Sequence, residues 1–332
     1  MRIGVIDIGS NTIHLLIAET DGDTLIPVAD PSRALFLGQD VAKTGRISPA
    51  RLGKAVSTVA EFAERARHAG VDQPIALATE AIRAAANGDD VLRTLQGIGI
   101  PIERISSRRE GELATIGAAL DSPTRAAAIL ADIGGASTQV VWMEHGRPHA
   151  LVSAPLGSGT LAAGLHGDPP GPAAIALLGG QIAPPLEAAL ASFGPLPPIH
   201  RLIGVGGTIR RLGRLATRSA PPMEPSRTAL VEVIEALFRA PAEPLSKRLG
   251  LDARRVGTLR VGGLVLLTLL HRLDNPKVRV SAAGIREGAA ILLARGVDPA
   301  ADGRFAPDDP APVYSPAFLA VGQTEDREVG PP

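Results

Sequence analysis

The chain of 332 residues contains no cysteine, and its seven histidines show no metal-ligand spacing. Without cysteine, neither a disulfide framework nor a thiolate metal site is available. No apolar run approaches 18 residues, and the strand-like start is interrupted at Asp7 without a cleavage-type region, so neither a membrane span nor a signal peptide is expected. The most apolar stretch, residues 261–270, fits a buried helix. These absences predict a cytoplasmic protein.

An excess of charge of one sign is also absent, because 34 Lys and Arg residues balance 34 Asp and Glu residues. No global field therefore steers the protein towards nucleic acid or a membrane, and neither is expected as a partner. Lysine is scarce, and the basic residues are mostly arginines that gather locally. Arginine pairs bidentately with oxyanions. Solvated helix faces in an arginine-rich protein account for most of these clusters as well.

A repeated motif organises the chain, with one copy at residues 4–17 and another at residues 129–142. Both copies read as an apolar strand, Asp-Ile-Gly, a small polar turn and a second apolar strand. A Val- and Ile-rich strand that ends in Asp-x-Gly and doubles back predicts a hairpin with an acidic tip. Each tip offers a carboxylate, a glycine that lets the backbone approach a ligand, and hydroxyl or amide donors. Such groups suit a phosphate with its magnesium ion, and two tips indicate two facing half-sites.

The elements after each copy also correspond. Third strands at residues 24–28 and 148–153 extend both hairpins into meanders, and strands then alternate with helices. A chain of this length is expected to form two domains. We predict a first domain at residues 1–121 and a second at residues 122–295, whose last helix is able to pack back on the first domain. Pro, Asp and Gly dominate residues 296–332, which predicts a disordered tail.

Two local expectations concern segments near the predicted tips. Residues 29–47 read as a loop, followed by a helix with Ser48 as its cap and Pro49 at its first position. A later helix is expected at residues 108–120. With Ser107 as its cap, Glu110 takes the capping-box position.

The two acidic tips supply the candidate metal ligands. A lone Asp at a strand end is usually a turn or cap residue, but two copies at equivalent positions favour a shared function for Asp7 and Asp132. Mg²⁺ characteristically binds through one or two carboxylates plus phosphate oxygens. The turn residues are then predicted to receive phosphate oxygens: Ser10, Asn11, Thr12, Gly134, Gly135, Ala136 and Ser137.

This arrangement resembles the actin/hexokinase/heat-shock ATPase superfold, in which a duplicated domain clamps phosphates between two hairpins. It is more closely similar to the exopolyphosphatase/guanosine pentaphosphate phosphatase family, on six motifs that run in family order. The motifs are residues 7–12, 78–83 with Asn87, 105–110, 132–138, 206–208 and 281–288. The resemblance implies an α/β fold of duplicated actin-like (ribonuclease H-like) domains. Each would be a mixed five-stranded sheet with flanking helices, and the active site would lie in the interdomain cleft.

The resemblance also implies an activity, the hydrolysis of a terminal phosphoanhydride in inorganic polyphosphate or in guanosine pentaphosphate (pppGpp). The implied cofactor is Mg²⁺, with Mn²⁺ as the alternative ion, and the implied assembly is a homodimer. Glu110 matches a glutamate that activates the attacking water, and Arg83 matches an arginine that contacts substrate phosphate. Gly207 and Thr208 open a helix whose N-terminus suits an anion. The alternatives are a helix cap for Glu110, a solvated helix face for Arg83 and a plain turn at Gly207.

Three departures from the family pattern bear on activity. Ala136 stands where the family commonly has glycine, so the backbone there must avoid conformations that only glycine adopts. Gln139 stands where a metal-binding glutamate is frequent; its amide oxygen still coordinates Mg²⁺ but carries no charge. The run Ser107-Arg108-Arg109 replaces a glycine-plus-acid pattern, which favours polyanion binding or marks a slower enzyme.

Two other functions stay open at this point. The departures motivate a diverged polyphosphate- or alarmone-binding protein that has lost turnover. A sugar- or acyl-phosphate kinase of the same superfold is the other alternative, although the sequence shows no sugar-binding constellation. Likeness of fold does not exclude it.

Overall fold

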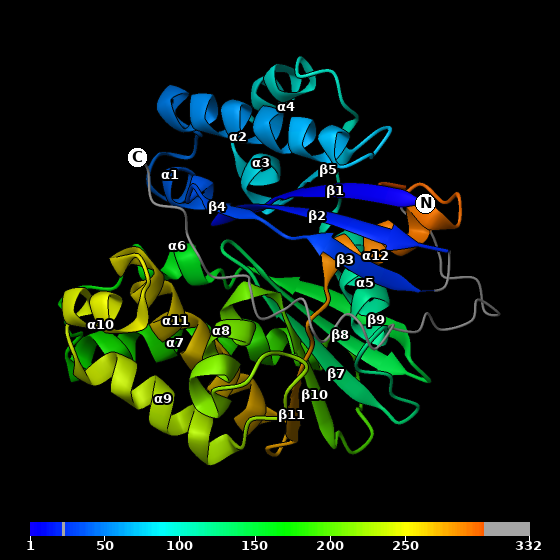
Figure 1. Ribbon diagram of the computed structural model, residues 1–332. Helices are drawn as coiled ribbons and strands as arrows, with labels where there is room; N and C mark the ends of the chain where they lie inside the picture. The colour runs from blue at the N-terminus through cyan, green and yellow to red at the C-terminus, as the bar shows by residue number, and fades with distance from the viewer. Residues whose placement is uncertain (22–23, 302–332) are drawn as a thin grey trace. The chain divides into compact units, whose positions relative to one another are not determined.

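The computed structural model describes residues 1–21 and 24–301, and it divides into two compact units (Figure 1). The first unit joins Met1–Pro123 to the chain from Ala283 onward, and the second is Thr124–Ala282. Most of the tail predicted to be disordered, residues 302–332, lies outside the described residues.

The first unit is built on a mixed sheet with the order β3-β2-β1-β5-β6. Its strands are β1 (Arg2–Ile8), β2 (Thr12–Thr20), β3 (Leu25–Ala29), β4 (Ser32–Ala34), β5 (Ile75–Ala78) and β6 (Ile102–Arg104). The first three strands form the expected antiparallel meander, and β5 and β6 run parallel to β1. Among the described residues this sheet has a sixth strand, β4, which pairs with β2 and which the expectation of five strands lacks. Three polar or small residues without apolar alternation leave no strand signal.

Helices cover both faces of this sheet: α1 (Leu37–Thr44), α2 (Pro49–His68), α3 (Glu80–Ala84), α4 (Gly88–Gln96), α5 (Ser107–Ala119) and α12 (Ile285–Ala294). Because side chains alternate along a strand, Ile6 and Ile8 join a core with α2, whereas Ile3 and Val5 join a core with α5 and α12. Figure 1 shows α2 and α5 on opposite sides of β1 and β2. The last helix thus packs with the first unit.

The second unit repeats this plan with the order β11-β10-β7-β8-β9. Its strands are β7 (Ala128–Ile133), β8 (Thr138–Glu144), β9 (Arg147–Ala154), β10 (Arg201–Val205) and β11 (Lys277–Val280). Its helices are α6 (Ser158–Ala162), α7 (Pro172–Ala191), α8 (Gly206–Thr217), α9 (Arg227–Arg239), α10 (Ala242–Leu249) and α11 (Ala253–Arg272). Strand β7 takes the place of β1, with an antiparallel meander on one side and parallel strands on the other. The duplicated α/β fold class is confirmed.

Two boundaries differ from the sequence prediction. Helix α1 occupies part of the predicted loop at 29–47; it opens at Phe36, whose φ of 54° is left-handed, and has no side-chain cap. The cap of α5 is Ser106 rather than Ser107, because the Ser106 hydroxyl accepts the Arg109 N–H. Glu110 therefore lies one position beyond the capping-box site, so the alternative prediction that it caps the helix was wrong.

Two helices bear on the membrane prediction. Residues 261–270 lie in the largely buried α11, as expected. Within residues 1–21 and 24–301, α7 is the one helix that is long and apolar enough to cross a membrane. A single helix of this kind is weak support for a membrane span, since length and composition alone qualify it.

Candidate functional site

The two acidic tips are equivalent in backbone geometry as well as in sequence. In the first, the Gly9 N–H donates to the Thr12 carbonyl at 3.1 Å; in the second, the Gly134 N–H donates to the Ser137 carbonyl at 3.0 Å. The strand registers also agree, since Asp7 lies opposite His14 and Asp132 lies opposite Gln139. The predicted repeat is therefore a repeat in three dimensions.

Each tip is held from behind through its carbonyl groups. The Ser10 carbonyl accepts the Gly38 N–H at 2.8 Å, and the Asn11 carbonyl accepts two N–H groups of residues 35–36. In the second tip, the Gly135 carbonyl accepts the N–H groups of residues 159 and 160 at 2.8 and 3.0 Å. A trans peptide directs its N–H opposite to its carbonyl. The Asn11 and Ala136 N–H groups therefore face away from these anchors, as an anion site requires.

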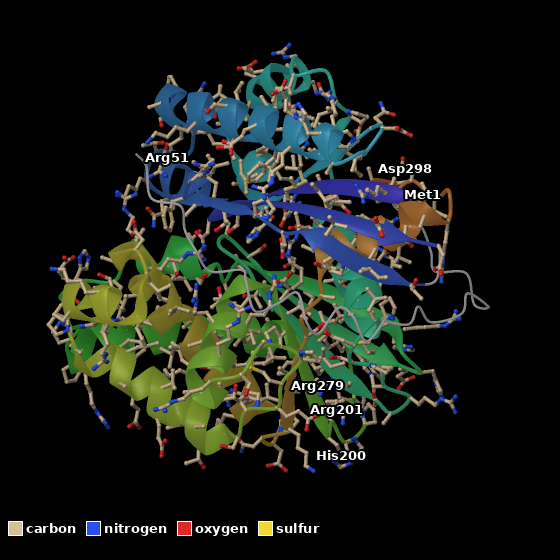
Figure 2. The ribbon with its side chains drawn as sticks, viewed as in Figure 1. Met1, Arg51, His200, Arg201, Arg279 and Asp298 are labelled. Carbon is tan, nitrogen blue, oxygen red and sulfur yellow. The ribbon has the colours of Figure 1, made fainter. Side chains whose placement is uncertain are left out.

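A salt bridge secures the anchor behind the first tip. Arg51 of α2, labelled in Figure 2, donates from Nε to the Asp40 carboxylate at 2.7 Å and from Nη1 to the Leu35 carbonyl. Asp40 also accepts the N–H and hydroxyl of Ser48, the predicted cap of α2. The segment that holds Asn11 is thus tied to a long helix, which makes the tip rigid.

Ala136 is compatible with its position in the second tip. Within the described residues, it is not one of those with positive φ, so its methyl group causes no backbone strain. Gly157 makes room for the backbone of the tip, because a Cβ atom there would lie 2.1 Å from the Ala136 Cα. The backbone at Ala136 thus avoids the conformations that only glycine adopts, as expected.

Replacing Gly157 by alanine should displace the second tip. Because the new Cβ would overlap the backbone of residues 135–136, we expect a loss of about 1–3 kcal/mol in the free energy of unfolding, measured by urea titration. Gly179 in α7 is a matched control, since a Cβ there meets nothing within 4 Å. The control should be neutral or stabilising by up to about 1 kcal/mol. Equal stability of the two variants would contradict this account of the tip.

Asp132 is a buried carboxylate at the end of β7, with 8% exposure. A Cβ atom on Gly206 would lie 2.4 Å from its Oδ1, so only glycine fits where α8 begins, and Gly206 has a φ of +83°. Burial raises the pKa of Asp132 to about 6, against the opposing charge of Arg210. Its side chain makes no hydrogen bond or ion pair within the described residues. A carboxylate in this setting fits a divalent cation, whose charge would replace the lost hydration.

Gln139 lies opposite Asp132 and is 2% exposed. Its Nε2 donates to the Ser137 hydroxyl at 2.9 Å and to the Ser153 hydroxyl at 3.4 Å. These bonds direct the nitrogen towards the serines and leave the amide oxygen as the end suited to a metal. Within the described residues no group of three His, Cys, Asp or Glu side chains could hold a metal ion. Asp132 and Gln139 therefore suit a cation that needs few protein ligands, as Mg²⁺ does.

The start of α8 lies beside Asp132. Gly207 is exposed, and the Cγ2 methyl of Thr208 packs where a Cβ on Gly262 would stand, at 2.2 Å. Val205 at the N-cap offers no side-chain cap. The first N–H groups of this 12-residue helix thus depend on water or a ligand. The structure therefore brings together the predicted Asp132, Gly207 and Thr208.

His14 is a neighbour of Asp7 that the sequence interpretation missed. Residues directly opposite in an antiparallel pair project from the same face, so the imidazole and the Asp7 carboxylate share one side of the sheet. His14 follows Asp7 by the same seven positions that separate Gln139 from Asp132. The repeat spacing was the signal that would have found it.

Glu110 and Arg83, predicted separately, are joined by an ion pair. The Arg83 Nη2 lies 2.6 Å from the Glu110 Oε2, and the Glu110 side chain is 7% exposed. Arg83 also donates to the Ile105 carbonyl at 2.6 Å and pairs with Glu80. Burial disfavours the charge of Arg83, but the carboxylates of Glu110 and Glu80 outweigh burial and raise its pKa. Arg83 is therefore a permanent cation that holds Glu110. The alternative that Arg83 is a solvated arginine on a helix face is excluded.

The plan of the first unit places Glu110 and Asp7 at the same edge of its sheet. Strands β1, β5 and β6 are parallel, so their carboxyl ends share one edge of the sheet. Asp7 is at the end of β1, and α5 begins three residues after β6. Asp7 alternates with Ile6 and therefore projects to the face that α5 covers.

Two matched motifs serve packing. The Asn87 side chain bonds both backbone groups of Ile47, at 3.0 and 2.9 Å. In the segment 281–288, the Glu287 carboxylate accepts the Gly284 N–H at 2.7 Å, and a Cβ on Gly288 would lie 2.0 Å from the Leu113 carbonyl. The segment thus seats α12 closely on α5.

Comparison with known proteins confirms the resemblance to the exopolyphosphatase/guanosine pentaphosphate phosphatase family. The Ppx/GppA phosphatase family matches residues 16–294. Exopolyphosphatase 1 of Mycobacterium tuberculosis is 30% identical over 342 residues, covering 98% of this chain and 97% of that protein. A crystal structure of the Aquifex aeolicus Ppx/GppA family member is 26% identical, with a TM-score of 0.74, over 89% of this chain and 98% of the other. An exopolyphosphatase structure from Cytophaga hutchinsonii, 23% identical over 91% and 100% of the two chains, has a TM-score of 0.82 and supports the fold.

Proposed function

Because the chain belongs to the Ppx/GppA phosphatase family, we propose that it is a Mg²⁺-dependent exopolyphosphatase that releases terminal orthophosphate from inorganic polyphosphate. Hydrolysis of the terminal phosphate of pppGpp is part of the same proposal, since both reactions cleave a phosphoanhydride. We also propose that the protein is cytoplasmic and forms a homodimer.

The observation that carries this proposal is the Arg83–Glu110 pair. Glu110 is freed from the capping box because Ser106 is the cap, and Arg83 holds its carboxylate at 2.6 Å. A buried carboxylate with a fixed orientation suits a group that orients and deprotonates water. A binding protein without turnover has no need of such a group.

The remaining residues have complementary roles in the proposal. The N–H groups of both tips and of α8, with Ser10, Thr12 and Ser137 beside them, bind the oxygens of the terminal phosphates. Glu110 takes a proton from the water as the water oxygen bonds to the terminal phosphorus and the bridging P–O bond breaks. The shortened chain keeps the electron pair of that bond. The products are orthophosphate and a polyphosphate one unit shorter.

Asp132 and Gln139, with Asp7 as a further ligand, are the residues proposed to hold Mg²⁺. Asp132 supports this role because it is a buried carboxylate without a hydrogen-bonding partner in the described part of the chain. When bound, Mg²⁺ neutralises charge on the phosphate oxygens.

Arg83→Ala should lower kcat more than it raises KM. The guanidinium already donates to three acceptors, in Glu80, Ile105 and Glu110. Its removal should therefore disturb the orientation of the Glu110 carboxylate more than it weakens substrate binding. We expect a roughly 10- to 100-fold fall in kcat, the range of a misplaced catalytic group, measured by initial rates with polyphosphate. Arg93→Ala, an exposed arginine with one i,i+3 pair, is the control. A rise in KM with unchanged kcat would instead indicate that Arg83 binds the substrate.

The proposed function is tested by phosphate release from long polyphosphate, short polyphosphate, pppGpp and ATP, each with Mg²⁺ and with EDTA. We expect Mg²⁺-dependent release from polyphosphate, and chelation should abolish it. Binding of polyphosphate without release from any substrate would favour the diverged binding protein. Transfer of phosphate from ATP to an added sugar or carboxylic acid would favour the kinase.

A further inference from the structure

Arg109, next to Glu110, is a buried guanidinium whose hydrogen bonds reach the end of the described chain. The residue is 4% exposed. Its Nε donates to the Pro299 carbonyl at 2.9 Å, and its Nη2 donates to the Asp298 carbonyl at 3.2 Å. Its Nη1 lies 3.0 Å from the Glu112 carboxylate. One side chain thus joins the first turn of α5 to residues 297–300, called here the C-terminal strap.

The C-terminal strap is a packed part of the first unit. It follows Gly296, whose φ of +71° turns the chain after α12. Pro299 is buried, and Ala300 packs against the apolar core that includes Ile105 and Leu113. The Ala300 N–H donates to the Asp298 carboxylate at 2.8 Å, which closes a turn. Figure 2 labels Asp298 in this segment.

The strap and Arg109 restrain α5 at its start. The Arg109 N–H donates to the Ser106 hydroxyl at 3.0 Å, so both ends of the residue are bonded. A buried charge that loses its partners is strongly destabilising, and this favours one position of the first turn. Arg108, by contrast, has a side chain 67% exposed and pairs with Glu112.

We propose that Arg109 is a positioning residue that, with the C-terminal strap, holds the first turn of α5 so that the Glu110 carboxylate stays on Arg83. The proposal rests on the proposed function, because positioning affects the rate only if Glu110 acts on water. It replaces polyanion binding as the role of this arginine, since two carbonyls and a carboxylate already occupy the guanidinium.

The main experiment compares Arg109→Gln with Arg108→Gln in the full chain. We expect Arg109→Gln to lower kcat for polyphosphate about 10- to 100-fold, because small displacements of a catalytic group have effects of that size. KM should stay within about 3-fold, and Arg108→Gln should leave both constants near the wild-type values. Arg109→Lys, which keeps the charge but not the planar fork, should recover part of the rate. A raised KM with unchanged kcat, or equal losses in the two glutamine variants, would overturn the proposal.

Pro299→Gly loosens the strap without altering α5 and serves if Arg109→Gln fails to fold. It should lower kcat in the same direction. Since both changes weaken the same contact between Arg109 and the strap, the double variant should lose little more than Arg109→Gln alone. An unchanged kcat in Pro299→Gly, or fully additive losses, would contradict the coupling.

Hydrogen exchange gives a measurement that needs no activity. In Pro299→Gly, amides of residues 106–113 should exchange faster than in the wild type, whereas those of α2 should not change. Equal exchange would refute the restraint on α5. If the wild type releases no phosphate from any substrate, the proposed function fails, and the exchange result still decides whether the strap holds the helix.

Discussion

Glu110→Gln should lower phosphate release from polyphosphate by roughly 10²- to 10⁴-fold, the span observed for a positioned acid–base group. Glutamine keeps the shape of the side chain and can still meet Arg83, but it cannot accept a proton from water. Initial rates with polyphosphate measure the effect. Substrate binding should be largely retained, because the tips and α8 supply the proposed phosphate contacts.

The control for this change is Glu103→Gln, which alters an exposed carboxylate on β6. It should leave kcat and KM near the wild-type values. Near wild-type turnover in Glu110→Gln would show that another group activates the water. A loss in both variants would indicate a general effect of charge on the protein.

Asp132→Asn should abolish most of the Mg²⁺-dependent activity and at the same time stabilise the metal-free protein. The folded pKa of Asp132 is about 6 and its ordinary value is 3.8. Because the carboxyl pKa is higher in the folded protein than in the unfolded chain, the free energy of unfolding is greatest at low pH, where the group is protonated in both the folded and the unfolded protein. It falls as the pH rises from about 4 to above 6, where the folded protein must ionise a buried group. At about 1.4 kcal/mol for each pKa unit, the cost above pH 6 is about 3 kcal/mol.

Urea unfolding in EDTA measures this effect. At pH 4 the variant and the wild type should be nearly equal, and at pH 7.5 the variant should be more stable by up to about 3 kcal/mol. Excess Mg²⁺ should narrow the gap, because the ion stabilises only the wild type. Asp72→Asn, at an exposed position, should show no such pH-dependent gap. A gap of equal size at both pH values would mean that the Asp132 charge does not cause it.

Much of the fold could be predicted because its signals are local. The alternation of apolar residues around Asp7 and Asp132 predicted both hairpins, and Ser48 with Pro49 predicted the start of α2, as observed. Helix α1 and strand β4 escaped prediction. Helix α1 is short and lacks a side-chain cap at its start, and β4 has no apolar alternation. Backbone hydrogen bonds to the first tip and to β2 help to fix them.

Parts of the candidate site could likewise be predicted from the sequence, and other parts could not. The duplicated acidic tips could be predicted from the repeated motif alone, whereas Glu110, Arg83 and Gly207 were named because they lie in motifs that resemble those of the family. The sequence also showed that the second tip departs from the family at Ala136. Only the tertiary structure decided what those residues do to one another: Arg83 pairs with Glu110, and Gly206 makes room for Asp132.

The role of Arg109 lay furthest from what the sequence could show. Beside Arg108 it read as one of two basic residues suited to a polyanion. Its partners, the carbonyls of Asp298 and Pro299, lie 189 and 190 residues away along the chain. Backbone carbonyls occur at every residue and so carry no sequence signal. Which of them meets a buried guanidinium depends on how α12 returns to α5, and packing alone decides that.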